Sequence, residues 1–579
     1  MSETPPLAAD QQSVVDCALE SKVLVTAGPG AGKTHTLVSR IEQLVTSDVD
    51  VAGQEVLSLS FSRAAVGELR RRLTALSSRG SRVRSATFDS FATRLLENYG
   101  DLPLEGVDYD RRIELATELI GAKPIDELIE IRHVCVDEAQ DLTGLRADFV
   151  LKLLEIASCG FTVFADQAQA IYDFGNEVPT GPPFVERLAD NYQTEISQIS
   201  LTTNHRTTDT SLLDIAALGD LIRTSDGDHE HVVTAFNRAV LGLPAAGSIG
   251  DAALMLNGAS GTAILTRRNS EALAVSAALY EAGVQHQFRR RADDPVISGW
   301  LSRLSLATSS RRITIEALEE AASGLPWSPA ATWSAVSTVV RPHRGVLNLD
   351  ELAETLAFRI PPDELLDGRA EGVVVSSIHR AKGLEFDTVL IVPFEIADEA
   401  WLQEARVLYV GLTRAKHNLM TLKRVDDGRW SYAPAAGRWR RIGFAGKHKY
   451  TTGVEISGPD AATFHPTGAT PPQRDPSELT AYLLAAVNAG DPVSLERRHL
   501  DASDCIYDVT HEGQWVAATT PRFGEVITQK LGLKSPPPRI EGCRVEAVAT
   551  TALPALVAEV LGIRNQLVPN CRIQGVGTW

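Results

Sequence analysis

The chain has 579 residues, too many for one hydrophobic core, and its 44% hydrophobic and 22% charged residues are typical of globular proteins. The net charge of −18 argues against a simple nucleic-acid coat protein, and six scattered cysteines without a CxxC pair support neither a zinc site nor a disulfide framework. No apolar run approaches the ~20 residues that span a bilayer, and the acidic N-terminus lacks a secretory pattern, so we expect a cytoplasmic protein without a membrane partner.

The first motif in the chain follows a short apolar run. The run KVLVT at 22–26 predicts a buried strand, which leads through AGPGAGKTHT into the helical pattern LVSRIEQLV. Three glycines in this loop allow backbone N–H groups to surround a polyphosphate, and the helix N-terminus adds its dipole. Lys33 would reach the β- and γ-phosphates, and Thr34 would hold Mg²⁺. The strand–loop–helix order therefore predicts a nucleotide site, although the strict pattern has glycine in place of Ala27.

Two segments are strongly basic. Residues 63–84 carry seven arginines against the single acid Glu68, and residues 423–450 carry eight Lys/Arg interleaved with five aromatic residues. Basic charge combined with aromatic rings suits a single nucleic-acid strand, because bases stack while phosphates pair with cations. Taken alone, however, both segments are better explained as solvated helix or loop faces.

A pair of adjacent acids follows another apolar run. The sequence IRHVCVDEAQD places Asp137 and Glu138 directly after a strand of wholly buried character. Ligands of α/β sheets bind at the carboxyl ends of the strands, so these carboxylates are expected at such an edge. Asp137 would support Mg²⁺, and Glu138 would orient or deprotonate the attacking water.

The apolar runs fall into two sets separated by a long helical stretch. Strands alternating with helices predict parallel sheets covered on both faces, and hence two α/β lobes. Residues 285–370 are mostly helical in pattern and are interpreted as an insertion in the second lobe. Residues 451–475 are rich in Thr, Gly and Pro and predict a linker, after which 476–579 predict a small, mostly β domain.

Nine motifs, in order between about residues 7 and 425, resemble those of superfamily 1 helicases of the UvrD/Rep/PcrA type. They are LAADQQSVV, AGPGAGKT, LSFSRAAVGELRRRL, TFDSFA, VDEAQD, ADQAQAIYDF, LTTNHRTT, SSIHRAKGLEFDTVLIV and EARVLYVGLTRAK. The resemblance implies two RecA-like P-loop NTPase lobes with ATP and Mg²⁺ as cofactors. The expected domains are a first lobe at 1–195 with a short insertion at 92–130, a second lobe at 196–284 and 371–450, the helical insertion, the linker and the β-rich domain.

The resemblance also assigns roles around the nucleotide. Gln11 would read adenine, Gln169 would sense the γ-phosphate and Glu385 would bind the ribose. Arg206 and Arg414 would act as arginine fingers from the second lobe. His35 and His205 stand where the family often has arginine and tyrosine near the base. The full expected nucleotide set is Gln11, Ala27, Gly28, Pro29, Gly30, Ala31, Gly32, Lys33, Thr34, His35, His205 and Glu385, with Thr34 and Asp137 on the metal.

On the nucleic-acid side, the resemblance points to residues of four motifs. These are Phe61, Ser62, Arg63, Thr87, Phe88, Ser90, Tyr172, Phe174 and His379. Phe61, Tyr172 and Phe174 would stack on bases. Two departures remove positive charge expected near the strand: Asp89 replaces a histidine, and Gly175 replaces an arginine.

The resemblance implies a DNA-stimulated ATP hydrolase, a 3′-to-5′ DNA helicase or translocase acting in repair. Its substrate would be single-stranded DNA or DNA with a 3′ tail. An alternative function follows from the short insertions, since the family's larger subdomains hold or separate the duplex. In this alternative the chain is a DNA-sensing ATPase that controls a separate nuclease, and it resembles the small UvrD-like subunits of phage-defence systems such as Gabija. Residues 476–579 would then dock the nuclease or another protein partner.

Overall fold

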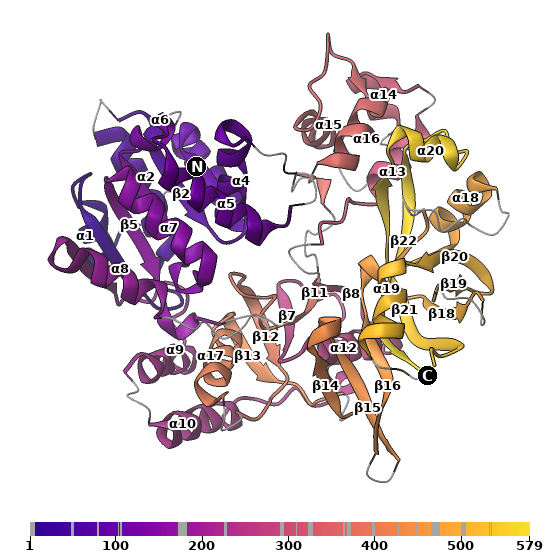
Figure 1. The fold of residues 1–579 in the computed structure, drawn as a ribbon. Coiled ribbons are helices and arrows are strands. Elements are labelled where there is room, and N and C mark those ends of the chain that lie inside the picture. Colours follow the sequence, from indigo (N-terminus) through magenta and orange to yellow (C-terminus); the bar gives the residue numbers. More distant parts are fainter. Residues whose placement is uncertain are drawn as a thin grey trace. The chain divides into compact units, whose positions relative to one another are not determined.

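The computed structural model divides into two compact units, which are described in turn (Figure 1). The first comprises Met1–Pro244 and Ala381–Met420, and the second comprises Ala245–Arg380 and Thr421–Trp579. The structure describes residues 6–47, 51–77, 80–101, 104, 107–171, 182–224, 228–289, 294–308, 310–321, 328–359, 361–362, 365–366, 372–396, 400–425, 428–445, 448–464, 475–499, 505–531, 533 and 535–579.

The first unit is built around a six-stranded sheet with the order β3-β2-β4-β5-β1-β6. Every pairing in it is parallel, as the strand–helix alternation predicts. The strands are β1 (Lys22–Ala27), β2 (Val56–Ser60), β3 (Arg84–Thr87), β4 (His133–Val136), β5 (Gly160–Ala165) and β6 (Ile196–Leu201). The inner strands are continuous apolar runs because helices cover both faces of the sheet.

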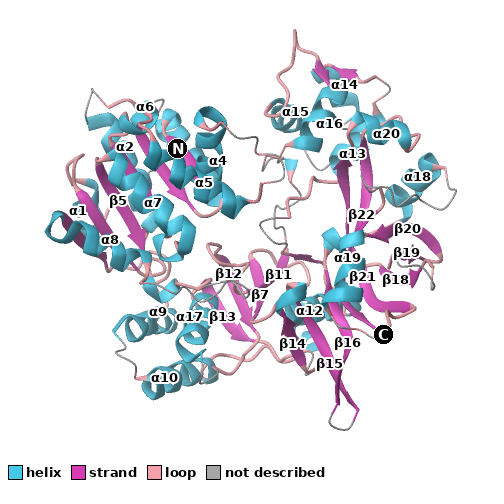
Figure 2. Cartoon of the chain, in the orientation of Figure 1, coloured by secondary structure: helices cyan, strands magenta, loops and turns pink. Residues whose placement is uncertain are grey.

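Side-chain alternation along the strands divides the core of this unit in two. Val23 and Val25 of β1 pack into one apolar cluster, whereas Leu24 packs into the other. The first cluster includes residues of α1 (Ala9–Val15), α2 (Lys33–Ser47) and α3 (Arg63–Leu76). The second includes residues of α4 (Phe88–Tyr99), α5 (Tyr109–Ala122), α6 (Asp126–Ile129), α7 (Gly144–Ala157) and α8 (Phe184–Tyr192). The sheet is therefore a covered layer whose strand ends carry the loops (Figure 2).

The expected lobe boundary at 195/196 would assign β6 to the second lobe, but β6 belongs to the first sheet. It pairs with β1 along its whole length and is the last strand of the first sheet. Its sequence ISQISL is polar at alternate positions, and only Leu201 of the strand is buried. Half-exposed alternation of this kind is typical of an edge strand, which a search for continuous apolar runs misses.

The rest of the first unit comprises α9 (Thr210–Thr224), α10 (His229–Leu241), β12 (Phe386–Ile391), α17 (Trp401–Leu412) and β13 (Ala415–Thr421). Helix α17 packs against both α9 and α10. Tyr409 of α17 donates a 2.8 Å hydrogen bond to the carbonyl of Ala216, and its ring meets Phe236 edge-on. The motif EARVLYVGLTRAK is thus anchored to the helices that follow β6.

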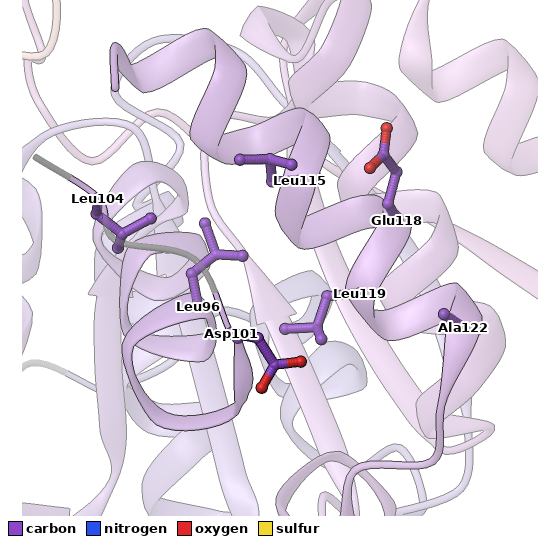
Figure 3. Close-up of a pocket in the computed structure, with 8 residues that line it drawn as sticks. Leu96, Asp101, Leu104, Leu115, Glu118, Leu119 and Ala122 are labelled. Atoms are coloured by element: carbon purple, nitrogen blue, oxygen red, sulfur yellow. The ribbon is translucent and has the colours of Figure 1, made fainter. Parts of the chain in front are cut away.

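The expected insertion at 92–130 forms the end of α4 together with α5 and α6. Helices α4 and α5 leave a small pocket between them, shown in Figure 3. Its apolar lining includes Leu96, Leu115 and Leu119, with the acids Asp101 and Glu118 also at the pocket. None of the residues expected to bind nucleotide or nucleic acid lines it.

His133 in β4 gives the first unit a predictable dependence on pH. Burial, together with the nearby Arg40 guanidinium, lowers the pKa of His133 to about 3, while Nδ1 donates to the Leu19 carbonyl and Nε2 accepts from Thr162. A histidine pKa lowered by folding means that the unfolded chain binds more protons between pH 6.5 and 3. Stability is therefore full above about pH 6.5 and declines as pH falls below it.

We expect this histidine to lower the free energy of unfolding by about 2 kcal/mol at pH 5 relative to pH 7.5. His133→Asn retains a donor for the Leu19 carbonyl but does not titrate in this range. Thermal unfolding at both pH values should therefore show a smaller pH effect for the variant than for the unmodified chain. An equal pH effect in both proteins would contradict the assignment.

The second unit contains three mutually parallel strands, β7 (Thr262–Thr266), β8 (His286–Phe288) and β11 (Val373–Ser377). Strand β11 pairs with both of the others, and α12 (Asn269–Glu281) packs against all three. These strands, with α11 (Ile249–Leu256) beside α12, confirm the second parallel α/β sheet expected from the sequence.

The expected helical insertion contains α13 (Trp300–Ala307), α14 (Ile315–Ala321), α15 (Pro329–Ser337) and α16 (Leu349–Phe358). A two-stranded ribbon of β9 (Arg312–Ile313) and β10 (Leu347–Asn348) lies among them in the chain. The helices share one apolar cluster, which also includes Leu567 of the C-terminal sheet. The insertion is therefore packed on the domain that follows it.

The C-terminal part forms a nine-stranded antiparallel half-barrel with the order β14-β15-β16-β22-β21-β18-β19-β20-β17. Its strands are β14 (Trp430–Ala433), β15 (Arg438–Ala445), β16 (His448–Ile456), β17 (Ala461–Ala462), β18 (Pro492–Arg497), β19 (Tyr507–His511), β20 (Gln514–Thr519), β21 (Arg539–Ala552) and β22 (Leu567–Thr578). Helices α18 (Pro476–Ala486), α19 (Pro521–Glu525) and α20 (Ala555–Val560) accompany them. The mostly β domain is confirmed.

Two expected limits around this domain are wrong. The sheet begins at Trp430, although 371–450 was assigned to the second lobe, and β16 occupies the start of the expected linker at 451–475. The segment TTGVEI is rich in Thr and Gly, but Thr451, Val454 and Ile456 are buried. Amino-acid composition suggests a linker here because it does not show which positions face a core. Among the described helices, none is long and apolar enough to cross a membrane.

Candidate functional site

The glycine-rich loop Gly28–Gly32 connects β1 to α2 at the carboxyl edge of the first sheet. Gly30 and Gly32 adopt positive φ angles of 81° and 76°, which side chains with a Cβ rarely tolerate. The turn after β6 lies against this loop: the His205 N–H donates to the Gly30 carbonyl at 2.7 Å, and the Asn204 amide donates to the Pro29 carbonyl at 3.2 Å. The loop is therefore held in a defined conformation by a second motif.

Gly30 offers a direct test of this packing. A Cβ at this position would lie 2.7 Å from the Asn204 Oδ1 atom and 2.8 Å from the Arg206 Cβ atom. Gly30→Ala should displace the turn that carries Arg206 and weaken ATP binding by roughly tenfold or more, the equivalent of about 1.4 kcal/mol. Gly513→Ala is the matched control, since Gly513 has φ of 74° with nothing within 4 Å of its Cβ position. Isothermal titration with a non-hydrolysable ATP analogue should detect the loss only in Gly30→Ala.

Lys33, the first residue of α2, has an amine suited to an anion. Its Nζ atom is buried and has no hydrogen-bond partner among the described residues. The closest ion pair is to the Glu138 Oε1 atom at 3.5 Å. Burial alone would lower the pKa of Lys33, but Glu138, Asp166 and Asp137 together raise it. A buried, charged and unsatisfied amine beside a glycine loop fits the phosphates of ATP.

The acid pair follows β4, as the sequence predicts. The Asp137 N–H donates to the Leu59 carbonyl at 2.9 Å, and Glu138 takes a left-handed conformation with φ of 52°. Burial and the neighbouring Glu138 charge raise the pKa of Asp137. Burial also opposes ionisation of Glu138, but Lys33, Lys382 and the Gln140 amide lower its pKa below the usual value. Glu138 is thus held as a carboxylate. Of the two acids, Asp137 is the one whose ionisation a bound cation would favour most.

The same unit contains both expected arginine fingers. Arg414 is buried; its Nη2 atom donates to the Gln169 side-chain oxygen at 2.9 Å and its Nε atom to the Val410 carbonyl at 2.9 Å. Burial and Arg206 lower the pKa of Arg414 to about 10, which leaves the guanidinium charged at neutral pH. Arg206 donates to the Thr413 carbonyl and forms an ion pair with Glu385.

The other residues expected at the nucleotide site lie in the following positions. The Gln11 amide donates to the Ala31 carbonyl at 3.2 Å, so it also supports the loop. Thr34 and His35 are half-buried in the first turn of α2, and His205 is exposed. Ala27 is buried at the end of β1. Glu385 is engaged by Arg206, so a role in ribose binding requires that this ion pair open or be shared.

Several residues that the sequence did not single out complete the site. Asp166, fully buried after β5, accepts from the Gln169 amide at 2.8 Å and pairs with Arg223 at 2.9 Å. Lys382 pairs with Asp141 and donates to the Gln169 carbonyl at 2.6 Å. Lys382 lies inside the motif RAKGLEF and could have been proposed from it. Arg223 lies in α9, outside the motifs, and carries no sequence signal.

The expected nucleic-acid residues are brought together only in part. Phe61 is 45% exposed and meets Phe88 edge-on, with ring centroids 5.9 Å apart. Phe88 is 1% exposed and packs in the core. It therefore supports the Phe61 ring and does not contact the nucleic-acid strand directly, contrary to what the sequence suggests. The Ser62 side chain caps α3, which begins at Arg63.

The other expected contacts divide between the two units. Thr87 and Ser90 hydrogen-bond to each other at the start of α4. His379 is half-buried after β11 in the second unit. Tyr172 and Phe174 lie outside the described residues. Asp89 pairs with Arg146 at 2.7 Å, which accounts for an acid at a position where the family has histidine.

No group of three or more His, Cys, Asp or Glu residues in the described part could by itself hold a metal ion. Magnesium in nucleotide sites is usually held by one or two protein oxygens together with substrate phosphates and water. The Thr34 hydroxyl and the Asp137 carboxylate fit that ligand set.

Two family models match the chain. The UvrD/REP helicase N-terminal domain matches residues 7–120, and the UvrD-like helicase C-terminal domain matches residues 372–421. The ATP-dependent DNA helicase UvrD2 of Mycobacterium tuberculosis is 26% identical over 581 aligned positions, which cover 74% of this chain and 80% of the relative.

Among solved structures, Pif1 helicase from Candida albicans aligns with a TM-score of 0.38 and 16% identity over 72% of this chain and 94% of that one. Pif1 helicase from Bacteroides in complex with ADP-AlF3 and single-stranded DNA aligns with a TM-score of 0.35 and 13% identity, covering 72% and 92%. The two matched family domains contain the glycine-rich loop and the RAKGLEF motif in the expected order, so in these segments the chain is similar to UvrD/REP-type helicases, and over most of its length it is similar to a relative named an ATP-dependent DNA helicase.

Proposed function

We propose that this chain is a DNA-stimulated ATPase that moves 3′ to 5′ along single-stranded DNA and separates strands as it moves. The observation that carries the proposal is the gathering of one complete set of phosphate-handling groups in the first unit. Lys33, with its buried and unsatisfied amine, lies beside Glu138, and the charge of Arg414 influences the pKa of both. Cations, a metal-compatible acid and an ionised carboxylate in one place are what phosphoryl transfer to water needs.

Each residue has a role that follows from its chemistry. ATP with Mg²⁺ supplies the transferable phosphoryl group and most of the charge neutralisation when bound. Thr34 and Asp137 would hold the metal. Glu138, kept ionised by the surrounding cations, would accept a proton from the attacking water. The Lys33 amine and the loop N–H groups would bind phosphate oxygens.

The two arginines would stabilise charge that develops in the transition state. Gln169 connects Arg414 with Lys382, because its side-chain oxygen accepts from Arg414 and its backbone oxygen accepts from Lys382. Gln169 also lies three positions before Tyr172, one of the proposed stacking residues. A change in the occupancy of the nucleotide site would thereby reach the chain segment that is expected to hold the strand.

The DNA preference and the 3′-to-5′ direction rest on the resemblance to the family and on relatives named DNA helicases. Phe61, 45% exposed at the sheet edge, supports a stacking role, with Ser62, Arg63, Thr87, Ser90, Tyr172, Phe174 and His379 as the other proposed contacts. We also propose that the first lobe extends to Leu201 and that the second lobe ends before Trp430.

A strand-separation assay on tailed duplexes tests the proposal. The full chain, ATP and Mg²⁺ are incubated with duplexes that carry only a 3′ tail or only a 5′ tail. Strand separation on the 3′-tailed duplex alone supports the proposed polarity, and separation on the 5′-tailed duplex alone contradicts it. DNA-stimulated hydrolysis without separation of either duplex would favour the DNA-sensing ATPase that controls a separate nuclease.

A further inference from the structure

The start of the C-terminal sheet is unusually basic. Residues 428–450 contain six Lys/Arg, five aromatic residues and no Asp or Glu, in a chain whose net charge is −18. The described residues of this segment include β14, β15 and the first part of β16, at one end of the nine-stranded sheet. The sequence alone favours solvated faces over nucleic-acid contact for this segment, so the structure is needed to show which side chains are available.

At the end nearer the core, the basic and aromatic side chains serve the fold. Arg438 pairs with Asp460 at 2.9 Å, and Val454, opposite Arg440, is fully buried. Trp439 meets Tyr432 edge-on, with the Arg268 guanidinium 4.9 Å from its ring centroid. These residues are structural and carry no inference about a ligand.

At the far end of the β15–β16 hairpin the surroundings differ. Phe444 is 40% exposed and lies directly opposite the exposed Lys449 in the strand ladder. Arg429, exposed before β14, places its guanidinium 4.7 Å from the Phe444 ring centroid. Neither Arg429 nor Lys449 forms an ion pair with a carboxylate among the described residues.

Tyr450 is the second open ring of the hairpin, at 51% exposed. It lies opposite Gly443, where a Cβ would come within 2.8 Å of the tyrosine Cζ atom. The glycine therefore leaves room for the ring to lie across the neighbouring strand. Because Phe444 pairs with Lys449 whereas Tyr450 pairs with Gly443, Tyr450 lies on the opposite face of the ladder from Phe444. We call Arg429, Phe444 and Lys449 the hairpin surface; all three belong to the second unit.

We propose that the hairpin surface binds single-stranded nucleic acid, with phosphates at Arg429 and Lys449 and a base stacked on Phe444. Charge complementarity supports this occupant, because cations that form no ion pair with the carboxylates of the described residues attract a polyanion even when the whole chain is acidic. The exposed Phe444 ring beside them can stack on an unpaired base, a contact that duplex DNA, whose bases are already stacked, does not offer. An acidic protein partner would satisfy the cations but leave the Phe444 ring without a matching ligand.

This site is additional to the proposed function, which places strand contacts on the motifs of the first unit and at His379. The two proposals can fail separately. Substitutions in the hairpin surface should weaken binding of the strand without altering ATP hydrolysis. Substitution of Lys33 should stop hydrolysis without altering binding of the strand.

The test uses the full chain without nucleotide and a fluorescein-labelled 20-mer of deoxythymidine, with anisotropy measured over a salt series. Phe444→Ala should raise Kd at least about fivefold, since a stacked base is worth roughly 5- to 150-fold. Arg429→Ala/Lys449→Ala should make the log Kobs against log salt plot shallower by about 1.4, which is about 0.7 for each phosphate contact. A duplex of the same length should bind more weakly than the single strand.

Matched controls come from the same domain. Arg539→Ala removes an exposed arginine of β21, and Leu556→Ala removes a 76% exposed apolar side chain of α20. Both should bind within twofold of the unmodified chain. In ATPase assays, the hairpin variants should need more DNA for half-maximal stimulation but should reach the same maximal rate.

Three results would overturn the inference. They are unchanged Kd and salt slope in both hairpin variants, equal losses in the two controls, and duplex bound as tightly as the single strand. A fall in maximal ATPase rate with unchanged DNA affinity would also contradict it, because that pattern belongs to the nucleotide site. None of these outcomes depends on whether the chain translocates.

Discussion

Replacing Lys33 by alanine is expected to reduce ATP hydrolysis by about 10²–10³-fold or more while single-stranded DNA binding stays within about twofold. The reason is local: the Lys33 amine is buried, charged and without a hydrogen-bond partner, and no other lysine of the described site has an unsatisfied amine. Lys382, the other nearby lysine, is already engaged by Asp141 and Gln169. It is therefore not positioned to replace the missing charge.

The measurement is steady-state phosphate release with and without a saturating oligonucleotide. Lys152→Ala is a suitable control, since Lys152 is a partly exposed residue of α7 paired with Glu155. Thermal unfolding of Lys33→Ala should show a folded protein, because Gln140 and Lys382 still act on Glu138. Turnover at the unmodified rate in a folded Lys33→Ala protein would show that the nucleotide site is wrongly assigned.

Arg414→Ala should lower kcat by about 10³–10⁵-fold, the range found for arginine fingers in related NTPases. Arg414 is 3% exposed, and the Val410 carbonyl and the Gln169 side chain hold its guanidinium. A group held this rigidly contributes electrostatic stabilisation without reorganising during the reaction. The loss should appear mainly in kcat, with KM for ATP changed much less, because the interaction strengthens as charge develops.

The conservative variant separates charge from geometry. Arg414→Lys keeps the charge but loses the planar fork that contacts Val410 and Gln169 together, so it should recover only a small part of the activity. Arg238→Ala, in an exposed position of α10, should leave kcat unchanged. Wild-type kcat in a folded Arg414→Ala protein would rule out the finger role and leave Arg414 as a structural residue that fixes Gln169.

Much of the nucleotide site could be anticipated because its chemistry is local in sequence. The loop from Gly28 to Thr34 and the pair Asp137–Glu138 each combine a strand, a turn and functional side chains within a dozen residues. Parallel strands bring their carboxyl ends to one edge, so these segments had to meet. Arg206, Gln169 and Arg414 could be proposed only through the resemblance, since nothing in their immediate neighbours specifies a phosphate.

Other features required the packed chain. Phe61 and Phe88 are both aromatic residues at strand ends, yet one is 45% exposed and the other 1%. The difference arises because Phe88 is the first residue of α4 and packs into the apolar cluster shared by α4, α5 and α7. The ion pair between Asp166 and Arg223 joins residues 57 positions apart, and no motif contains the arginine.

The sequence by itself determined the α/β class, the order of the motifs and the residue types that handle phosphate, because these depend on local hydrophobic periodicity and on short-range chemistry. Only the tertiary structure decided that β6 completes the first sheet, that the C-terminal half-barrel begins at Trp430 and that Phe444 and Tyr450 are open while Trp439 is covered. Those properties depend on long-range strand pairing and burial, which the free energy of the whole fold selects and which no short segment specifies.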